Sequence, residues 1–427
     1  MKYNSLIFTF IFIINSGIIA QNTLLLHCGK IIDISSEKPI LKSTIAVQDD
    51  KILWIKKGYK KRTENEKIID LKNKTVLPGL MDMHTHLSGQ SSPTRYIDRF
   101  TKNISDIAYE SVGYSKKTLM SGFTTVREVG GPVSISLRNA INKNLIVGPR
   151  IYAAGKSIAT TGGHADPTNG MRFDIMGDPG PKEGVINSES DARKAVRQRY
   201  KNGADLIKIT ATGGVLSVAK NGQNPQFTEA EIKAIVETAN DYGMHVAAHA
   251  HGIEGMQRAI RAGVKSIEHG TLMDKETFEL MKKYGTYYVP TISAGRFVAE
   301  KAKEPGYYPD VIRPKALEIG PKIQNTFSKA FRAGVKIAFG TDSGVSYHGE
   351  NANEFIYMVE AGMKPIEALR SATINAAEML EIDDKLGTIE PGKIADIIAV
   401  SGDPLEDISC LNDVDFVMKN GQVFKGN

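Results

Sequence analysis

The sequence predicts an α/β protein, in which a (β/α)8 barrel carries a small β-sandwich domain built from both ends of the chain. Three observations support this prediction. Residues 79–380 alternate short apolar strands with helices. Residues 21–78 and 381–427 contain short strand-like runs and turns, and neither segment is long enough for a core of its own. Finally, histidine, lysine and aspartate side chains follow several central strands, where a parallel barrel places its active site.

Length and composition agree with this organisation. The chain has 427 residues, enough for one barrel and a smaller domain, and is 41% hydrophobic and 24% charged, as in ordinary globular proteins. The formal net charge is +6, but both signs are interspersed and no nucleic-acid motif is present, so we expect no nucleic-acid partner. Two cysteines, Cys28 and Cys410, are too few for a disulfide framework.

The N-terminus has the pattern of a secretory signal peptide. Lys2 precedes an apolar run over residues 6–14, and small residues follow up to Ala20. We therefore expect residues 1–20 to be removed, which leaves Gln21 first in an exported protein, either periplasmic or secreted. The apolar run is short for a mature anchor, so no stable membrane anchor is expected. The sequence leaves formation of a homo-oligomer open.

The strand-like runs at the two chain ends are apolar or alternate between apolar and polar residues. Asp49-Asp50 and Asn420-Gly421 have turn chemistry between neighbouring runs. The expected strands are Leu24–His27, Lys30–Ile34, Thr44–Gln48, Lys51–Ile55, Lys67–Asp70, Asp396–Val400, Phe416–Lys419 and Gln422–Lys425.

The clearest strand–helix units lie in the second half of the barrel segment. Thr228 and Glu231 form a capping box that opens a helix ending near Gly243. Repeated units of this size imply a parallel sheet with right-handed crossovers. A closed barrel is favoured over an open doubly wound sheet, because the candidate ligands come from strands spread along the whole segment. The expected elements are strands His245–Ala250, Val264–His269, Thr286–Thr291 and Val335–Gly340, and helices Ile253–Ala262 and Lys275–Tyr284.

Several histidines and one aspartate occupy the ends of these strands. His84 and His86 are two residues apart, so on a strand both rings would face one cation. His269 and Asp342 each end a predicted strand, and histidines with a carboxylate are ligands for Zn²⁺ or a similar ion. His249 and His251 also share one face, and periodicity alone does not decide which of the two binds metal.

Lys208 occupies an unusual position within the predicted strand 204–210. A lysine at a strand end can extend its ammonium group to water. Alternatively, a buried and unpaired ammonium group is unfavourable and tends to become neutral. A neutral amine can react with CO2 to form an anionic carbamate, whose two oxygens can bridge two cations. The residues leave both interpretations open.

Taken together, these motifs resemble the amidohydrolase superfamily. Segments 124–130 and 161–164 are more similar to its branch of Xaa-Pro dipeptidases and imidazolonepropionase-like proteins, and 387–396 is similar to the family's return to the β-domain. The segments that carry the resemblance to the superfamily are Pro78–His86, Ala204–Lys208, His249–Gly252, Glu268–Thr271 and Gly340–Gly344.

The resemblance implies two divalent metal ions, with zinc as the expected metal. By this comparison one ion is bound by His84, His86 and Asp342. The second is bound by His249 and His269, and carboxylated Lys208 bridges both. The remaining roles that the resemblance implies are proton transfer by Asp342 and substrate binding by His164 and His251. Arg127 ends an early strand, where it would form either an ion pair or a substrate contact.

The implied activity is hydrolysis of C–N amide bonds in dipeptides, Xaa-Pro-like, or in N-acyl amino acids. Water is activated between the two cations, and Asp342 passes its proton to the leaving nitrogen. Alternatives are an imidazolonepropionase-like cyclic amide hydrolase and a lactonase or phosphotriesterase-like hydrolase. A deaminase of the same fold is disfavoured by Lys208, and a non-catalytic binding protein is disfavoured by the complete ligand set.

Overall fold

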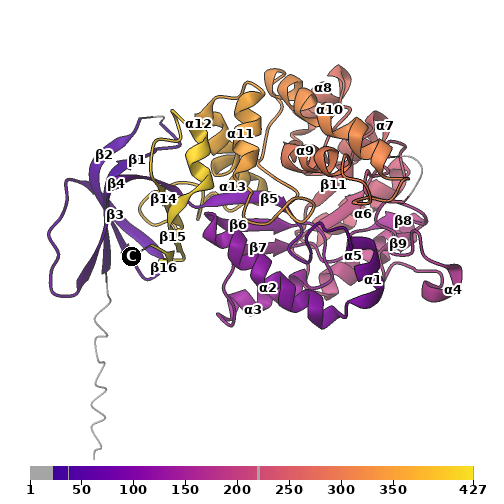
Figure 1. Cartoon of the computed structure of the whole chain (residues 1–427), viewed down its shortest axis with the longest axis horizontal. Helices are drawn as coiled ribbons and strands as arrows, with labels where there is room; N and C mark the ends of the chain where they lie inside the picture. Colours follow the sequence, from indigo (N-terminus) through magenta and orange to yellow (C-terminus); the bar gives the residue numbers. More distant parts are fainter. Residues whose placement is uncertain (1–22, 37, 219–221, 427) are drawn as a thin grey trace, which may run out of the picture.

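The computed structural model describes residues 23–36, 38–218 and 222–426. The expected signal peptide, residues 1–20, lies outside the described residues. Figure 1 shows a small β-domain at one end of the molecule and a larger body of strands and helices at the other. Within the described part of the chain, no helix is long and apolar enough to cross a membrane.

Eight parallel segments form a closed barrel, as predicted. Backbone hydrogen bonds of 2.8 Å from Asp205 to Ala153, from Tyr288 to Lys336 and from Met83 to Phe339 join the sheets into a ring. The segments are β5 (Leu80–Thr85), β6 (Phe123–Glu128), β7 (Arg150–Ala153), β10 (Ile207–Thr210), β11 (Val246–Ala250), β12 (Ser266–His269), β13 (Tyr287–Val289) and residues 336–340.

The last two barrel segments are less regular than the sequence predicts. β13 ends at Val289 rather than Thr291, and residues 336–340 pair only through single bridges and hydrogen bonds. Thr291 and Asp342 have φ values of 54° and 59°, which turn the chain out of the extended conformation. The ladder therefore stops where these two side chains must point into the barrel mouth.

Helices surround the barrel. The predicted capping box is present: Glu231 N donates to Thr228 Oγ1 at 3.2 Å, and Thr228 N donates to Glu231 Oε2 at 2.8 Å. The helices are α1 (Arg95–Thr101), α2 (Ile104–Met120), α3 (Ser134–Asn142), α4 (Phe173–Met176), α5 (Glu189–Lys201), α6 (Glu229–Asp241), α7 (Ile253–Arg261), α8 (Lys275–Tyr284), α9 (Ile292–Lys301), α10 (Arg313–Arg332), α11 (Asn353–Glu360), α12 (Pro365–Ser371) and α13 (Ile374–Leu380).

Both chain ends contribute to one seven-stranded sheet with the order β16-β15-β14-β4-β1-β2-β3. Inward side chains from both groups of strands, such as Leu26, Ile45, Ile397 and Phe416, pack in one buried cluster. The strands are β1 (Thr23–Ile31), β2 (Ile40–Gln48), β3 (Lys51–Lys57), β4 (Glu66–Pro78), β14 (Ile397–Val400), β15 (Val414–Lys419) and β16 (Gln422–Lys425).

Two expectations for this sheet are wrong in detail. Leu24–His27 and the start of Lys30–Ile34 are not separate strands but parts of β1, which continues through an irregularity between Cys28 and Lys30 and ends at Ile31. Gly29 allows this continuity, because a Cβ there would lie 2.0 Å from the carbonyl oxygen of Lys72 in β4. β4 is also longer than predicted, since it pairs with β1 and then with β14.

Candidate active site

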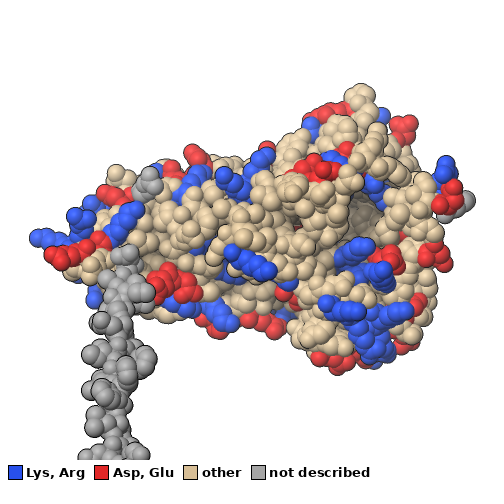
Figure 2. All heavy atoms as spheres, turned by 90° about the horizontal axis from the view of Figure 1, so that it is seen from below, with Lys and Arg blue, Asp and Glu red and all other residues tan. Residues whose placement is uncertain are grey.

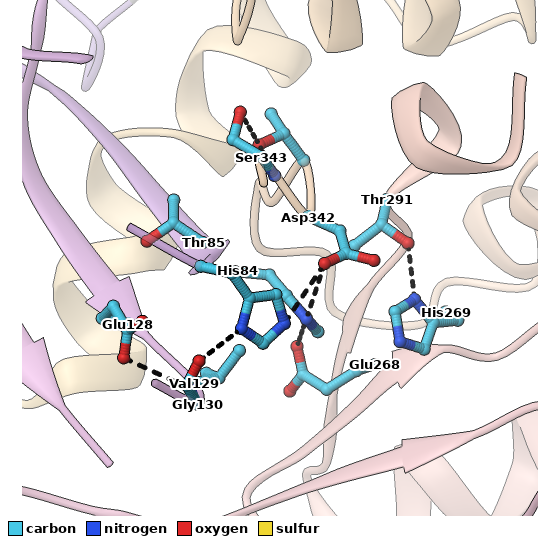
Figure 3. A network of polar contacts seen from close by, with 12 residues as sticks. His84, Thr85, Glu128, Val129, Gly130, Glu268, His269, Thr291, Asp342 and Ser343 are labelled. Atoms are coloured by element: carbon cyan, nitrogen blue, oxygen red, sulfur yellow. Dashed lines mark hydrogen bonds and ion pairs between the residues drawn. The ribbon is translucent and has the colours of Figure 1, made fainter. Parts of the chain in front are cut away.

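His84, His86 and Asp342 meet at the carboxyl ends of two adjacent barrel segments. His84 lies in β5, His86 follows it, and Asp342 follows residues 336–340. Asp342 Oδ1 lies 3.3 Å from His86 Nε2 and 3.5 Å from His84 Nε2. Figure 3 shows Asp342 beside His84. One candidate ligand atom from each residue lies within 4.8 Å of the others. The three side chains therefore form a cluster that could hold a metal ion.

The remaining predicted ligands line the same cavity. The ring of His269 lies 4.9 Å from that of His84 and 4.7 Å from that of His249, measured between centroids. Lys208 also lines the cavity, which has a volume of about 880 Å³. His164 and His251, predicted to contact substrate, face the same space. The structure thus brings all eight predicted site residues together at the mouth of the barrel.

Hydrogen bonds orient the first two histidines. His84 Nδ1 lies 2.7 Å from Glu268 Oε2, and His86 Nδ1 lies 2.7 Å from the Gly130 carbonyl oxygen. A carbonyl oxygen only accepts, so His86 Nδ1 carries the proton, and an ionised Glu268 requires the same of His84. Both rings then turn an unprotonated Nε2 toward Asp342, the arrangement a metal ligand needs.

The other two histidines are oriented in a similar manner. His249 Nε2 donates to the Gly213 carbonyl oxygen at 3.0 Å, which leaves its Nδ1 as the unprotonated nitrogen. His269 Nδ1 lies 2.7 Å from Thr291 Oγ1. In Figure 3 this contact turns the ring of His269 toward Thr291 on one side and toward the centre of the site on the other.

Three residues on the side of the cavity that carries the predicted metal ligands have a strained backbone. His269, Thr291 and Asp342 all have positive φ, at 69°, 54° and 59°. Such conformations are unusual for residues other than glycine, and a β-branched threonine is especially disfavoured there. Asp342 N donates to the His84 carbonyl oxygen at 2.7 Å, which fixes the strained residue against β5. The strain therefore coincides with the residues whose directions define the site.

Burial keeps the imidazole rings neutral. Burial lowers the pKa of His86 to about 4 and that of His164 to about 3. The pKa values of His84, His249 and His269 lie well below the usual histidine value for the same reason. A neutral ring has a lone pair to offer a cation, so these residues suit metal coordination.

Lys208 and Asp342 are coupled charges in the same buried space. Burial lowers the pKa of Lys208, and the carboxylates of Glu268 and Asp342 oppose this shift. Burial raises the pKa of Asp342, while the positive charges of Lys208 and Arg95 lower it. Asp342 Oδ1 is buried and accepts no hydrogen bond within the described residues. A buried carboxylate oxygen without a donor fits a site built for cations.

Glu268 is an important residue to which sequence reasoning assigned no role. It lies between His84 and Arg127: besides its contact with His84, its Oε1 accepts from Arg127 Nη2 at 2.7 Å. Arg127 is fully buried and also donates to Ser266 Oγ and to the Met83 carbonyl oxygen. The open question about Arg127 is thereby answered: it forms a buried ion pair beneath the site. The only available signal was the Glu268-His269 pair itself, which does not identify these distant partners.

Asp82 is a second such residue. Its carboxylate is buried and accepts from Thr341 Oγ1 at 2.6 Å, from Asn351 Nδ2 at 2.8 Å and from His84 N at 3.0 Å. These contacts join β5 to the loop that carries Asp342. Asp82 alternates with His84 along β5 in a fully buried strand, where no polar periodicity distinguishes it.

The two predicted substrate residues lie beside the second group of ligands. The ring of His164 stacks on that of His249, with centroids 4.4 Å apart and planes 25° apart. Its Nδ1 is buried and has no hydrogen-bond partner in the part of the chain that the structure describes. His251 Nδ1 lies 2.7 Å from Thr271 Oγ1. His164 therefore has a ring nitrogen available to a ligand.

Comparison with known proteins identifies the family. Residues 75–424 match the amidohydrolase family. A crystal structure of a Xaa-Pro dipeptidase with bound methionine is 54% identical, with a TM-score of 0.91 over 95% of this chain and 100% of that chain. A prolidase complexed with N-methylphosphonate-L-proline is 31% identical, with a TM-score of 0.86 and the same coverage. Ochratoxinase from Aspergillus niger is 31% identical over 94% of this chain and 86% of that protein. This chain therefore belongs to the amidohydrolase family and is a hydrolase.

Proposed function

We propose that the protein is a binuclear metal-dependent amidohydrolase that cleaves the C–N bond of dipeptides, with Xaa-Pro dipeptides and N-acyl amino acids as the substrate classes. One observation carries the proposal. Neutral histidines, a buried aspartate and a buried lysine surround a single cavity, and hydrogen bonds to Glu268 and Gly130 turn two of the rings toward Asp342. This donor set suits divalent cations rather than a serine or cysteine nucleophile.

The proposed ligands divide into two groups. His84, His86 and Asp342 would bind one zinc ion, and His249 and His269 the other. Lys208 would bridge them as a carbamate, formed when its neutral amine attacks CO2 and releases one proton. Burial of Lys208 favours that neutral amine. When bound, such ions make water nucleophilic near neutral pH and polarise the scissile carbonyl group.

Side chains of the protein would then transfer the proton and bind the substrate. Asp342 would accept the proton of the attacking water at Oδ1, the buried oxygen without a hydrogen-bond donor, and deliver it to the leaving nitrogen. Glu268 and the Gly130 carbonyl would hold the histidine rings in place. His164 and His251 would offer hydrogen bonds to a carboxylate on the amine half of the substrate.

The relatives support this choice of substrate. Those similar to the chain over nearly its full length include proteins named Xaa-Pro dipeptidase and prolidase, and one of them carries a proline phosphonate. The cavity of about 880 Å³ is large enough for a dipeptide or an N-acyl amino acid. The ochratoxinase relative extends the comparison to a further hydrolase.

A kinetic comparison tests the proposal. The zinc-loaded enzyme would be assayed for kcat/KM with Xaa-Pro dipeptides, with matched Xaa-Ala dipeptides, with N-acyl amino acids and with a lactone. We expect the highest values for substrates with an amide bond and a free carboxyl terminus. Faster cleavage of the lactone, or no cleavage of any amide, would contradict the assignment.

Export is a separate proposal, which rests on the sequence pattern of residues 1–20 alone. N-terminal sequencing of the secreted or periplasmic protein should begin at or near Gln21. An intact Met1 in that fraction would contradict it.

A further inference from the structure

Three cationic side chains, two of α1 and Lys102 directly after it, line the mouth of the cavity, and one differs from the others. Lys102 pairs with Glu110 at 2.8 Å and with Asp98 at 3.3 Å, and Arg99 Nη2 donates to the Pro167 carbonyl oxygen at 2.8 Å. Arg95 also lines the cavity, but its Nη1 is buried and has no hydrogen-bond partner in residues 23–36, 38–218 and 222–426. Figure 2 shows a hollow with Lys and Arg side chains beside it.

Contacts on either side hold Arg95 in place. The hydroxyl group of Tyr96 donates to the Leu216 carbonyl oxygen at 3.0 Å, and the contact of Arg99 with Pro167 attaches the next turn of the helix. Both partners belong to loops that line the same cavity as His164 and His251. α1 is therefore docked across the mouth, and the half-buried Arg95 lines the cavity with its Nη1 buried.

Acidic side chains that line the same cavity have other partners, and Asp342 lies among the proposed metal ligands, with Oδ1 near His84 and His86. Asp98 and Glu110 pair with Lys102, and Asp166 accepts from the backbone N–H groups of Gly162 and Thr168, both at 2.8 Å. A buried guanidinium donor without an acceptor is unfavourable. Its planar fork matches a carboxylate with two parallel hydrogen bonds. The missing acceptor is thus expected to come from a ligand.

We propose that Arg95 is a specificity-determining residue that binds a carboxylate of the substrate. This proposal rests on the proposed amide hydrolysis and adds to it the cationic side chain that binds the substrate carboxylate. Two carboxylates share this chemistry: the α-carboxylate of the amine half, and an acidic side chain on the acyl half. Arg95 has a buried guanidinium nitrogen without a partner among the described residues, so it is the cationic group of the mouth that would distinguish a carboxylate from an amide of the same shape.

Two matched substrate pairs separate these sources. Ala-Pro and its carboxyl-terminal amide differ only at the α-carboxylate, and Glu-Pro and Gln-Pro differ only at the side chain. The ratio of kcat/KM within each pair would be measured for the zinc-loaded parent, Arg95→Gln and Arg95→Lys. Lys156→Gln is the control, because it removes an exposed cationic side chain from the same cavity and leaves Arg95 and the contacts of α1 unchanged.

We expect the parent to prefer the carboxylate member of at least one pair by about 10- to 100-fold, as for charge-assisted hydrogen bonds. That preference should disappear in Arg95→Gln, return in part in Arg95→Lys and persist in Lys156→Gln. The pair that responds identifies the carboxylate. Equal preferences in the parent and Arg95→Gln for both pairs, with full metal content and unchanged Tm, would overturn the proposal.

A binding measurement distinguishes this outcome from failure of the proposed function. Calorimetry with L-proline against L-prolinamide, and with L-glutamate against L-glutamine, needs no turnover. A parent that cleaves no amide yet binds one carboxylate more tightly, through Arg95, would reject the proposed function and retain the anion site. Identical binding preferences in the parent and Arg95→Gln would reject the anion site.

Discussion

Two parts of the cavity are held by different kinds of contact. The ligand wall carries the predicted metal ligands, such as His84 and Asp342, and the mouth is the entrance at His164 and Arg95. On the wall, the second nitrogens of His84 and His86 are bound by Glu268 and Gly130, so the rings have one direction. At the mouth, His164 Nδ1 and Arg95 Nη1 are buried and lack hydrogen-bond partners among the described residues. The hydrogen bonds on the wall orient the histidine rings without a substrate, whereas the mouth has buried nitrogens that a ligand could pair with.

Strain follows the same division. The positive φ values of His269, Thr291 and Asp342 all lie on the wall, and such conformations cost about 1–3 kcal/mol each. The surrounding strands and hydrogen bonds must supply that energy, as the contact of Asp342 N with the His84 carbonyl does. The fold thus fixes the direction of the metal ligands in advance, whereas the side chains proposed to select the substrate keep nitrogens without partners among the described residues.

The largest loss of activity is expected from a substitution of Lys208. Lys208→Ala removes the proposed bridging group, so we expect the enzyme to lose the second ion and nearly all turnover. Metal analysis and kcat for a dipeptide would be measured with and without a short carboxylate such as acetate. Partial rescue by acetate is expected. A Lys208→Ala enzyme with full metal content and normal turnover would contradict the bridging role.

Asp342→Asn should fold normally and retain metal but lose activity by about 10²- to 10⁴-fold, because an amide does not accept the proton of the attacking water. The measurement is kcat at full metal loading. Asp98→Asn is the control, since Asp98 lies at the mouth and pairs with Lys102. Near-normal turnover of Asp342→Asn would remove this residue from proton transfer.

Glu268→Gln tests whether the hydrogen bond between Glu268 and His84 orients this metal ligand. The substitution breaks a buried ion pair with Arg127, which costs about 3–5 kcal/mol of folding free energy. It also weakens the contact that orients His84, so metal affinity should fall by about 10- to 100-fold. Thermal unfolding and a metal titration measure the two effects. Unchanged metal affinity would show that Glu268 serves the fold alone.

The smallest effect is expected at Thr291. Thr291→Val keeps the branched shape and the strained backbone but removes the Oγ1 contact with His269. We expect about a tenfold loss of metal affinity and little change in Tm. Thr291→Ser is the matched variant that keeps the hydroxyl, and it should bind metal normally. Equal metal affinities for the two variants would show that the hydroxyl contact with His269 does not contribute to metal binding.

The sequence predicts the wall better than the mouth. Alternation along a strand is local, so the pairing of His84 with His86 and the placement of His269 at a strand end could be inferred from a few residues. The structure brings these residues together with Asp342 because all parallel strands of a barrel end on one side.

The contacts that orient those residues could not be predicted in this way. Glu268 approaches His84 across 184 positions of the chain, and no local pattern encodes that pairing. Arg95 was missed because its environment depends on how α1 docks, through Tyr96, onto Leu216. The division of β1 into two strands was wrong, because Gly29 lies inside β1, where the carbonyl oxygen of the distant Lys72 leaves no space for a Cβ.

Stepwise reconstitution with zinc tests the central claim most directly. The metal-free enzyme would receive increasing zinc, and bound metal and kcat/KM for a Xaa-Pro dipeptide would be measured on the same samples. The proposed site predicts that activity reaches its plateau at about two ions per chain, because one ion of the pair activates water and the other polarises the carbonyl. Full activity at a single bound ion, or no amide hydrolysis with both sites filled, would contradict it.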